Sequence, residues 1–364
     1  GGGGYFSAPG GSGGSGGGGN GTNPQSGAGQ PGAGGDGGGG GGSAYQPGGN
    51  APGSNGGSGR VVIRIPAADA PGSVAVSPGT NQLSTDGPTG DKIAVFTVDG
   101  TLTVDSGGGN ISVAGNISST GTDEVISFTD GASSSGTITL GGTVSASSIT
   151  LVGDSGIELT GNITSNTATS AANNAAGAIT FTGPVSLAGN VTIDADQHNA
   201  TTVTFNSAVD SKVASTGASS GDPGKSLTID TANGAIQMQG AIGGSKALTA
   251  LTINDDGDST IEIANIGSTT VGVTGVTAIG NTSTHTLTLD GTTYKTTGSQ
   301  TYTNMSAASG GGDIVISGTT PTFTTDGTAI EFSTADVILS NNGTTTITTG
   351  SGAGGVTFGG AIET

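Results

Sequence analysis

Residues 177–193 have the sequence Gly-Ala-Ile-Thr-Phe-Thr-Gly-Pro-Val-Ser-Leu-Ala-Gly-Asn-Val-Thr-Ile, in which short alternating runs are separated by glycine. The alternation places Ile179 and Phe181 on one face of a strand and the intervening threonines on the other. The Gly-Pro dipeptide at 183–184 predicts a turn, after which the alternation starts again. We predict that the inward-facing residues form the core: Ile179, Phe181, Val185, Leu187, Val191 and Ile193.

Loosely similar phrases recur elsewhere, beginning at Gly136, Gly234 and Gly355. From about residue 105 onward strand-like phrases follow one another, and no apolar i, i+3, i+4 pattern lasts long enough for a helix. Glycine and β-branched residues also oppose helix formation. We therefore predict an all-β domain over residues 105–364.

Two all-β architectures fit this pattern: a parallel β-helix, whose coils stack on one another, and a row of β-sandwich domains. A sandwich needs a larger core, whereas the chain has no Trp and only 3% aromatic residues. Long inserts at 166–176 and 211–225 also favour coils, because a coil accepts an insert at one corner. We predict a parallel β-helix (β-solenoid) with about ten or eleven coils of roughly 20 to 25 residues, forming a rod on the order of 50 Å long.

The composition of the chain limits the thickness of its core and the classes of partner that it can bind. The chain has 364 residues but a mass of only 34.0 kDa, and 76 residues are Gly. Hydrophobic residues make up 31%, which favours a thin core repeated many times. The net charge is -19 at pH 7, and the lysines after Arg64 are scattered along the sequence, which argues against a nucleic-acid partner. Cys is absent, which excludes disulfides and thiolate metal sites.

The sequence also bears on location. No run of 18 apolar residues occurs, so we predict no transmembrane helix. Without an initiator Met, the sequence is expected to be a portion of a longer protein, with the solenoid continuing beyond residue 364. An acidic chain rich in Thr and Gly and poor in Lys and Trp is typical of secreted bacterial repeat proteins. We predict an extracellular or cell-surface location, bacterial or phage-associated.

Residues 1–59 form a Gly-rich segment that admits two interpretations. It is either a flexible tether or a set of packed polyproline II-like or polyglycine II-like runs, which Gly permits because it lets backbones approach closely. The composition changes abruptly after it, where Val61, Ile63 and Ile65 alternate in a β-branched strand. We interpret residues 60–104 as a short β-strand junction module.

This first part of the chain carries a resemblance. Gly-Ser-Gly at 57–59 precedes a Val/Ile-rich strand that contains Arg64. Leu-Ser-Thr-Asp-Gly follows at 83–87, and then Lys-Ile-Ala-Val-Phe-Thr-Val-Asp-Gly-Thr-Leu-Thr-Val at 92–104. In this order, residues 1–105 resemble the Gly-rich modules of phage and bacterial surface proteins. The resemblance implies a surface or fibre module, and it carries no catalytic residues.

A second resemblance lies in residues 105–364. Residues 247–260 have the sequence Ala-Leu-Thr-Ala-Leu-Thr-Ile-Asn-Asp-Asp-Gly-Asp-Ser-Thr, and 295–302 have Lys-Thr-Thr-Gly-Ser-Gln-Thr-Tyr. These phrases resemble the strand repeats of haemagglutinin-like and autotransporter-like giant bacterial adhesins. The resemblance implies a right-handed parallel β-helix with an adhesive or structural role. No clean copy repeats twice in this chain, so the resemblance does not define the coil boundaries.

The acidic turn after the first of these phrases is a candidate metal site. Asp255, Asp256 and Asp258 could bind Ca²⁺, which takes several hard oxygen ligands. Their spacing does not complete an EF-hand loop, and a solvated acidic turn is the alternative interpretation. We predict no other cofactor.

Residues that could support catalysis are sparse. The two histidines, His198 and His285, are far apart in polar contexts, which is typical of surface residues. Glycan cleavage on a β-helix would need clustered carboxylates, and two neighbouring pairs could supply them: Asp123 with Glu124, and Asp194 with Asp196. No Arg follows Arg64 to assist them. We predict that the protein is not an enzyme.

The Thr-x-Thr phrases allow one further hypothesis about a surface of the protein. Flat hydroxyl arrays of the kind used by ice-binding solenoids could form from three pairs: Thr137 with Thr139, Thr180 with Thr182, and Thr286 with Thr288. The phrases lack a constant short period, and Thr is a common outward strand residue, so a plain solvated face is the simpler interpretation.

Together these features predict an extracellular structural or adhesive fibre segment, a stiff spacer that self-associates end to end or through the Gly-rich segment. Cell-surface glycans or other cells are the expected partners. Two alternatives stay open: a carbohydrate-active β-helix of the tail-spike or depolymerase type, and a Ca²⁺-stabilised adhesin module.

Overall fold

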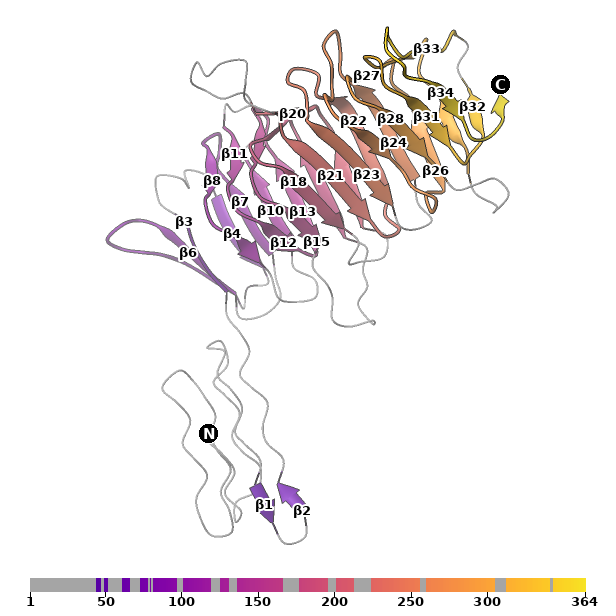
Figure 1. The fold of residues 1–364 in the computed structure, drawn as a ribbon. Helices are drawn as coiled ribbons and strands as arrows, with labels where there is room; N and C mark the ends of the chain where they lie inside the picture. Colours follow the sequence, from indigo (N-terminus) through magenta and orange to yellow (C-terminus); the bar gives the residue numbers. More distant parts are fainter. Residues whose placement is uncertain are drawn as a thin grey trace. The chain divides into compact units, whose positions relative to one another are not determined.

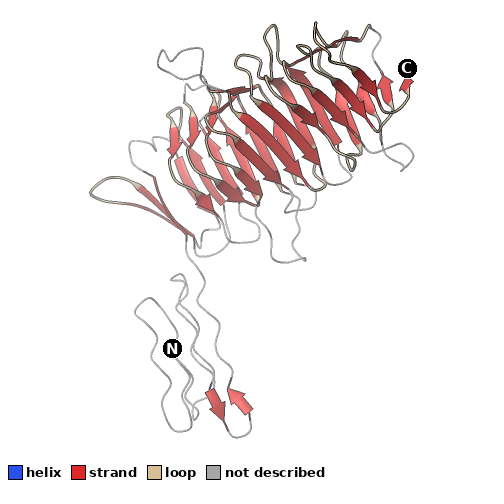
Figure 2. Ribbon diagram, in the orientation of Figure 1, coloured by secondary structure: helices blue, strands red, loops and turns tan. Residues whose placement is uncertain are grey.

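The computed structural model describes the residues of two compact units, which we treat separately. The described residues are 44–46, 49–51, 61–65, 73–77, 79, 81–96, 101–118, 125–130, 136–165, 177–195, 201–212, 224–255, 260–304, 312–340 and 343–364. They form strands and turns, with no helix (Figure 2). One unit comprises residues 1–68 and 74–102, and the other 69–73 and 103–364.

The described strands of the first unit form three antiparallel pairings. β1 (Ala44–Gln46) and β2 (Gly49–Ala51) form a hairpin within the Gly-rich segment. β3 (Val61–Ile65), β6 (Lys92–Phe96) and β5 (Gln82–Thr85) form a three-stranded sheet in that order. The strand predicted at Val61–Ile65 is thus confirmed. The remaining described strand of this region is β4 (Ser73–Ser77). Most of residues 1–59, to which the tether and packed-run interpretations apply, lies outside the described residues.

The second unit is a parallel β-solenoid with three ladders of stacked strands (Figure 1). The first ladder contains β7 (Thr101–Asp105), β10 (Val125–Thr129), β13 (Ser148–Val152), β16 (Ala178–Thr182), β19 (Thr202–Phe205), β22 (Ile236–Ile242), β24 (Thr260–Ile266), β26 (Thr286–Leu289), β29 (Ile314–Ile316), β32 (Val337–Leu339) and β35 (Ile362–Glu363).

The second ladder contains β8 (Ile111–Val113), β11 (Ile138–Leu140), β14 (Ile157–Leu159), β17 (Val185–Leu187), β20 (Val209–Ser211), β27 (Thr293–Lys295), β30 (Thr322–Thr324) and β33 (Thr346–Thr348). Between β20 and β27, the C-terminal ends of the long strands β22 and β24 continue this ladder. β22 turns from one ladder into the other at a register shift between Met238 and Ala241.

The third ladder is a 10-stranded parallel sheet. It contains β9 (Ile117–Ser118), β12 (Val144–Ala146), β15 (Ile163–Ser165), β18 (Val191–Ala195), β21 (Ser226–Thr231), β23 (Ala250–Asp255), β25 (Thr277–Ile279), β28 (Gln300–Thr303), β31 (Ile330–Ser333) and β34 (Val356–Phe358). One strand from each ladder, in chain order, makes one coil, except that β22 and β24 each supply the first and second ladders of their coil. The predicted β-solenoid is therefore confirmed.

The core is a set of in-register rows running along the solenoid. In the first ladder, Ile149 pairs with Ile179, and Ile179 pairs with Val203. Two residues further along the same strands, Phe181 and Phe205 stack with ring centroids 4.4 Å apart. Every core residue predicted from residues 177–193 is at most 2% exposed. Period-2 alternation therefore determines which side chains fill the thin interior.

Coil length varies more widely than predicted. Val144 pairs with Ile163, a step of 19 residues, whereas Val191 pairs with Leu227, a step of 36. In the longer steps consecutive strands are further apart in sequence, as with β15, which ends at Ser165, and β16, which begins at Ala178. A fixed repeat is absent because the ladders constrain only the strands. In the part of the chain that the structure describes, no helix is long and apolar enough to span a membrane.

Candidate functional site

Of the predicted acidic site, the structure describes Asp255 alone. Asp255 is the last residue of β23, pairs in register with Thr231 and has a fully buried side chain. This burial differs from the solvated position that the alternative interpretation assigns to it. Asp256 and Asp258 lie outside the described residues. Among the described side chains, no group of three or more His, Asp or Glu could hold a metal ion.

The fold assembles a polar row beside Asp255 that sequence proximity does not indicate. Asn281 Nδ2 donates to Asn254 Oδ1 (2.5 Å), and Asn254 Nδ2 donates to Asp230 Oδ1 (3.2 Å). Asp230 pairs in register with Asp194, one coil further along. Each side chain comes from a different coil, so its neighbours in the row are distant in sequence. The amides of the row bridge coils, which explains polar residues at half-buried positions.

The other predicted candidates are not brought together. His285 is exposed just before β26, whereas His198 lies outside the described residues. Asp123, Glu124 and Asp196 also lie outside them. Asp194 on β18 pairs in register with Asp230 on β21.

The threonine phrases form only a short array. Thr180 on β16 pairs in register with Thr150 and Thr204, so three hydroxyls lie side by side on adjacent coils. Further along the same row come Gln237 and Glu262, which interrupt it. Thr137 precedes β11, and Thr139 has Glu158 as its neighbour in a different ladder. A long flat array is thus not built from the predicted pairs.

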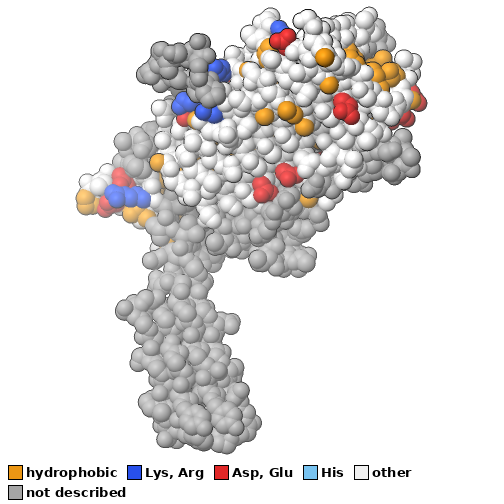
Figure 3. All heavy atoms as spheres, in the orientation of Figure 1, with side chains coloured by type: hydrophobic (Ala, Val, Ile, Leu, Met, Phe, Trp, Pro, Cys, Tyr) orange, Lys and Arg blue, Asp and Glu red, His pale blue; other side chains and the backbone are white. Residues whose placement is uncertain are grey.

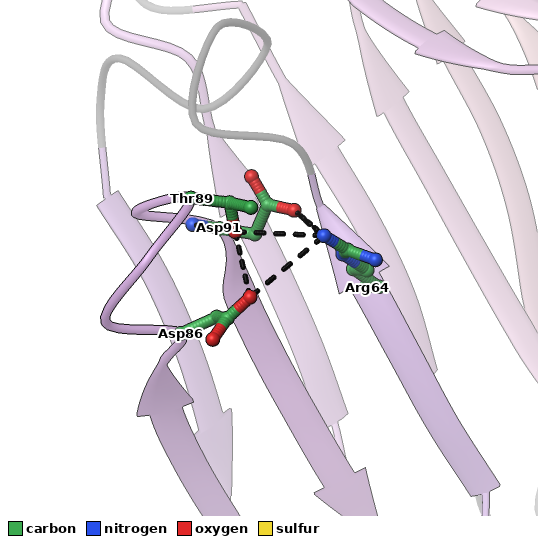
Figure 4. Close-up of polar contacts among 4 residues, drawn as sticks. All are labelled: Arg64, Asp86, Thr89 and Asp91. Carbon is green, nitrogen blue, oxygen red and sulfur yellow. Dashed lines mark hydrogen bonds and ion pairs between the residues drawn. The ribbon is translucent and has the colours of Figure 1, made fainter.

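In the three-stranded sheet of the first unit, Arg64 forms a polar cluster with the turn that joins β5 to β6 (Figure 4). Its Nε donates to Asp91 Oδ2 (2.5 Å), and a guanidinium nitrogen lies 3.8 Å from Asp86 Oδ2. Thr89 Oγ1 donates to the same Asp86 oxygen (2.8 Å). The guanidinium thus contacts two carboxylates, and these contacts hold the turn against β3. Such part-exposed pairs contribute at most about 1 kcal/mol each.

The solenoid gathers three lysines that are scattered in sequence. The main-chain N–H of Lys225 donates to Ser211 Oγ (2.8 Å), and the N–H of Ser211 donates to the carbonyl of Lys246 (3.1 Å). Lys212, next to Ser211, forms an ion pair with Glu158 (2.6 Å). The main chains of the three lysines therefore lie close together, and the ammonium of Lys212 has an acidic partner. The face drawn in Figure 3 shows mostly uncharged atoms, with small separate groups of blue, red and orange side chains.

Two tyrosines are buried in the core of the coil formed by β26–β28. Tyr294 OH donates to the carbonyl of Ile263 (3.1 Å) and accepts from the N–H of Gly291 (2.8 Å). Tyr302 OH donates to Gln300 Oε1 (2.9 Å). Burial raises the pKa of Tyr294, against the opposing effect of the Gly291 N–H, and the Asp290 charge raises it further. Burial, and then Tyr294, raises the pKa of Tyr302 well above its usual value.

The raised tyrosine pKa values predict alkaline lability of the solenoid. Below the unfolded pKa of about 10 both phenols are neutral in both states, so this contribution to stability is complete. Above it the unfolded chain releases protons first, so the free energy of unfolding falls by up to about 1.4 kcal/mol per pH unit per tyrosine. We expect the urea midpoint to fall between pH 9 and pH 11 less steeply in a Tyr294→Phe/Tyr302→Phe variant than in the native chain. Equal losses in both proteins would contradict this account.

Sequence reasoning singled out the phrase at 295–302 but not the buried polar residues in it. Gln300, Thr301 and Tyr302 alternate, so Gln300 and Tyr302 share the inward face of β28. The alternation of residues 300–302 could have indicated that Gln300 faces inward. The sequence did not suggest this, because Gln is usually an exposed residue.

Comparison with known proteins does not add to this geometry. No protein-family model matches the chain, and no curated protein or solved structure is significantly similar to it. The functional conclusion therefore depends on the solenoid itself.

Proposed function

We propose that this chain is a segment of an extracellular structural or adhesive fibre, in which the second unit is a stiff β-solenoid spacer. The observation that carries the proposal is the in-register stacking of all three ladders, as in the row Ile149, Ile179 and Val203. Every coil is joined to the next by main-chain hydrogen bonds on three sides, so the unit resists bending and stretching.

The proposed setting is the bacterial cell surface or a phage particle. The net charge of -19, the abundance of Gly and the two resemblances support this location. Strand edges can add further strands by main-chain pairing, which supports self-association into filaments, end to end or through the Gly-rich segment. Cell-surface glycans or other cells are the proposed partners.

The proposed role is not enzymatic. Glycan hydrolysis needs two carboxylates on either side of the scissile bond, in distinct environments. Asp194 and Asp230 instead lie in one row on adjacent strands, where Asn254 bonds to Asp230. This row supports a structural use of its carboxylates.

Negative-stain electron microscopy of the full chain tests the spacer role. We expect a straight rod on the order of 50 Å long for the solenoid, because coils stack at about 4.8 Å. Filaments many times longer would support end-to-end assembly. Compact particles without an elongated part would contradict the proposal.

A parallel incubation with capsular or cell-wall glycans separates the spacer from the enzyme alternative. We expect no new reducing ends. Their release, and its loss in an Asp230→Asn variant, would favour a carbohydrate-active β-helix instead.

A further inference from the structure

Coils of a solenoid touch only their neighbours, so each coil-to-coil interface decides whether two coils open together or separately. Most interfaces of this solenoid consist of main-chain pairing and aliphatic rows, such as Ile193, Ile229 and Ile253 in the third ladder. The coil formed by β26–β28 differs, because its interior carries polar side chains that reach into both adjoining coils.

The amide of Gln300 provides the contact with the coil that follows. Its Nε2 lies 2.9 Å from the carbonyl of Tyr294 in its own coil and 2.9 Å from the carbonyl of Thr324 on β30 in the next coil. Thr296 Oγ1 lies 3.1 Å from the same nitrogen, and the Oε1 atom accepts from Tyr302 OH. The side chain is fully buried, so water cannot replace a lost partner while the coil stays folded.

The hydroxyl of Tyr294 provides the contact with the preceding coil. It donates to the carbonyl of Ile263 on β24. Tyr294 is linked to Gln300 through its own carbonyl, so the two side chains form one continuous connection. That connection runs from β24, through β27 and β28, to β30.

Aromatic stacking follows the same path. Tyr294 stacks on Phe323 of the next coil with centroids 4.5 Å apart, and Tyr302 stacks on Phe332 at 5.2 Å. The two stacks meet edge to face, with Tyr302 and Phe323 at 5.7 Å. Pulling the next coil away therefore breaks both stacks and the Gln300 hydrogen bond together.

We infer that Tyr294, Gln300 and Tyr302 couple three successive coils, those containing β24, β27 and β30, into one cooperative opening unit. This deepens the proposed spacer role, because a coupled block resists coil-by-coil opening under load. The coupling is a property of the fold, and it can be tested whether or not the spacer role holds.

Hydrogen exchange of the full chain, followed by mass spectrometry at several urea concentrations, tests the coupling. In the native chain, amides of β24, β27, β28 and β30 should exchange through one opening, with the same rate and the same urea dependence. In Gln300→Leu, which replaces the amide by an apolar side chain of similar size, amides of β30 and β31 should exchange at least about tenfold faster, while those of β24 stay unchanged.

Two further variants serve as a control and as a milder change of the same hydrogen-bond network. Gln237→Leu changes an outward-facing glutamine on β22 and should leave exchange unaltered. Tyr302→Phe keeps the ring stack but removes the hydroxyl, so it should give a smaller change in the same place even if Gln300→Leu fails to fold. Independent exchange of the three coils in the native chain would overturn the inference. So would an equal increase in every coil of Tyr302→Phe.

Discussion

Phe181→Asp is expected to abolish the cooperative unfolding of the solenoid. Phe181 is fully buried, stacks on Phe205 and pairs in register with Leu151 on the other side. The substitution removes a large apolar side chain, at a cost of about 3 to 5 kcal/mol, and adds the cost of burying a carboxylate. The sum is comparable to the whole stability of many domains, about 5 to 15 kcal/mol. Thermal unfolding followed by circular dichroism measures it.

The matched control is Thr180→Asp, one residue away on the same strand. Thr180 faces outward between Thr150 and Thr204, where a charge stays solvated. Its effect should stay within about 1 kcal/mol. An unchanged melting curve for Phe181→Asp, or equal losses in both variants, would refute the inward and outward assignment of this strand.

The sequence was sufficient to predict the class of fold and the inner face of the strands in residues 177–193. Alternation at Ile179 and Phe181 carries that information locally, because successive side chains of a strand point to opposite faces. The three ladders could not be derived in the same way. Strands of three residues, such as β17 (Val-Ser-Leu) in the second ladder and β12 (Val-Ser-Ala) in the third, have nearly identical patterns, so nothing local tells which ladder each one joins. Irregular connections then conceal the repeat.

The candidate site was less predictable, because its contacts join residues from different coils. Asp255, Asp256 and Asp258 are adjacent in sequence, yet Asp255 faces inward beside Thr231. The row of Asp230, Asn254 and Asn281 depends on register between coils, which the sequence alone does not supply. The number of residues in a coil decides which polar residues of adjacent coils lie side by side, and that number varies along the chain.

Gly234→Ala is expected to destabilise the solenoid by at least about 3 kcal/mol, through steric overlap rather than through a special backbone conformation. Gly234 lies in the turn between β21 and β22, where the preceding coil passes directly against it. A Cβ atom here would lie 1.6 Å from the carbonyl oxygen of Thr201 and 2.3 Å from its carbonyl carbon. Both atoms belong to the backbone, so relief requires the two coils to separate at this corner. Urea unfolding at neutral pH measures the loss.

Gly115→Ala provides the comparison, because Gly115 lies in a turn of the same solenoid and a Cβ atom there would meet nothing within 4 Å. Its effect should be within about 1 kcal/mol, and a small gain is allowed because Ala restricts the unfolded chain more than Gly does. If the two variants lost the same stability, chain flexibility and not coil spacing would explain the glycines at these corners. If only Gly234→Ala is affected, the close approach of successive backbones is what requires glycine in the turns of the solenoid.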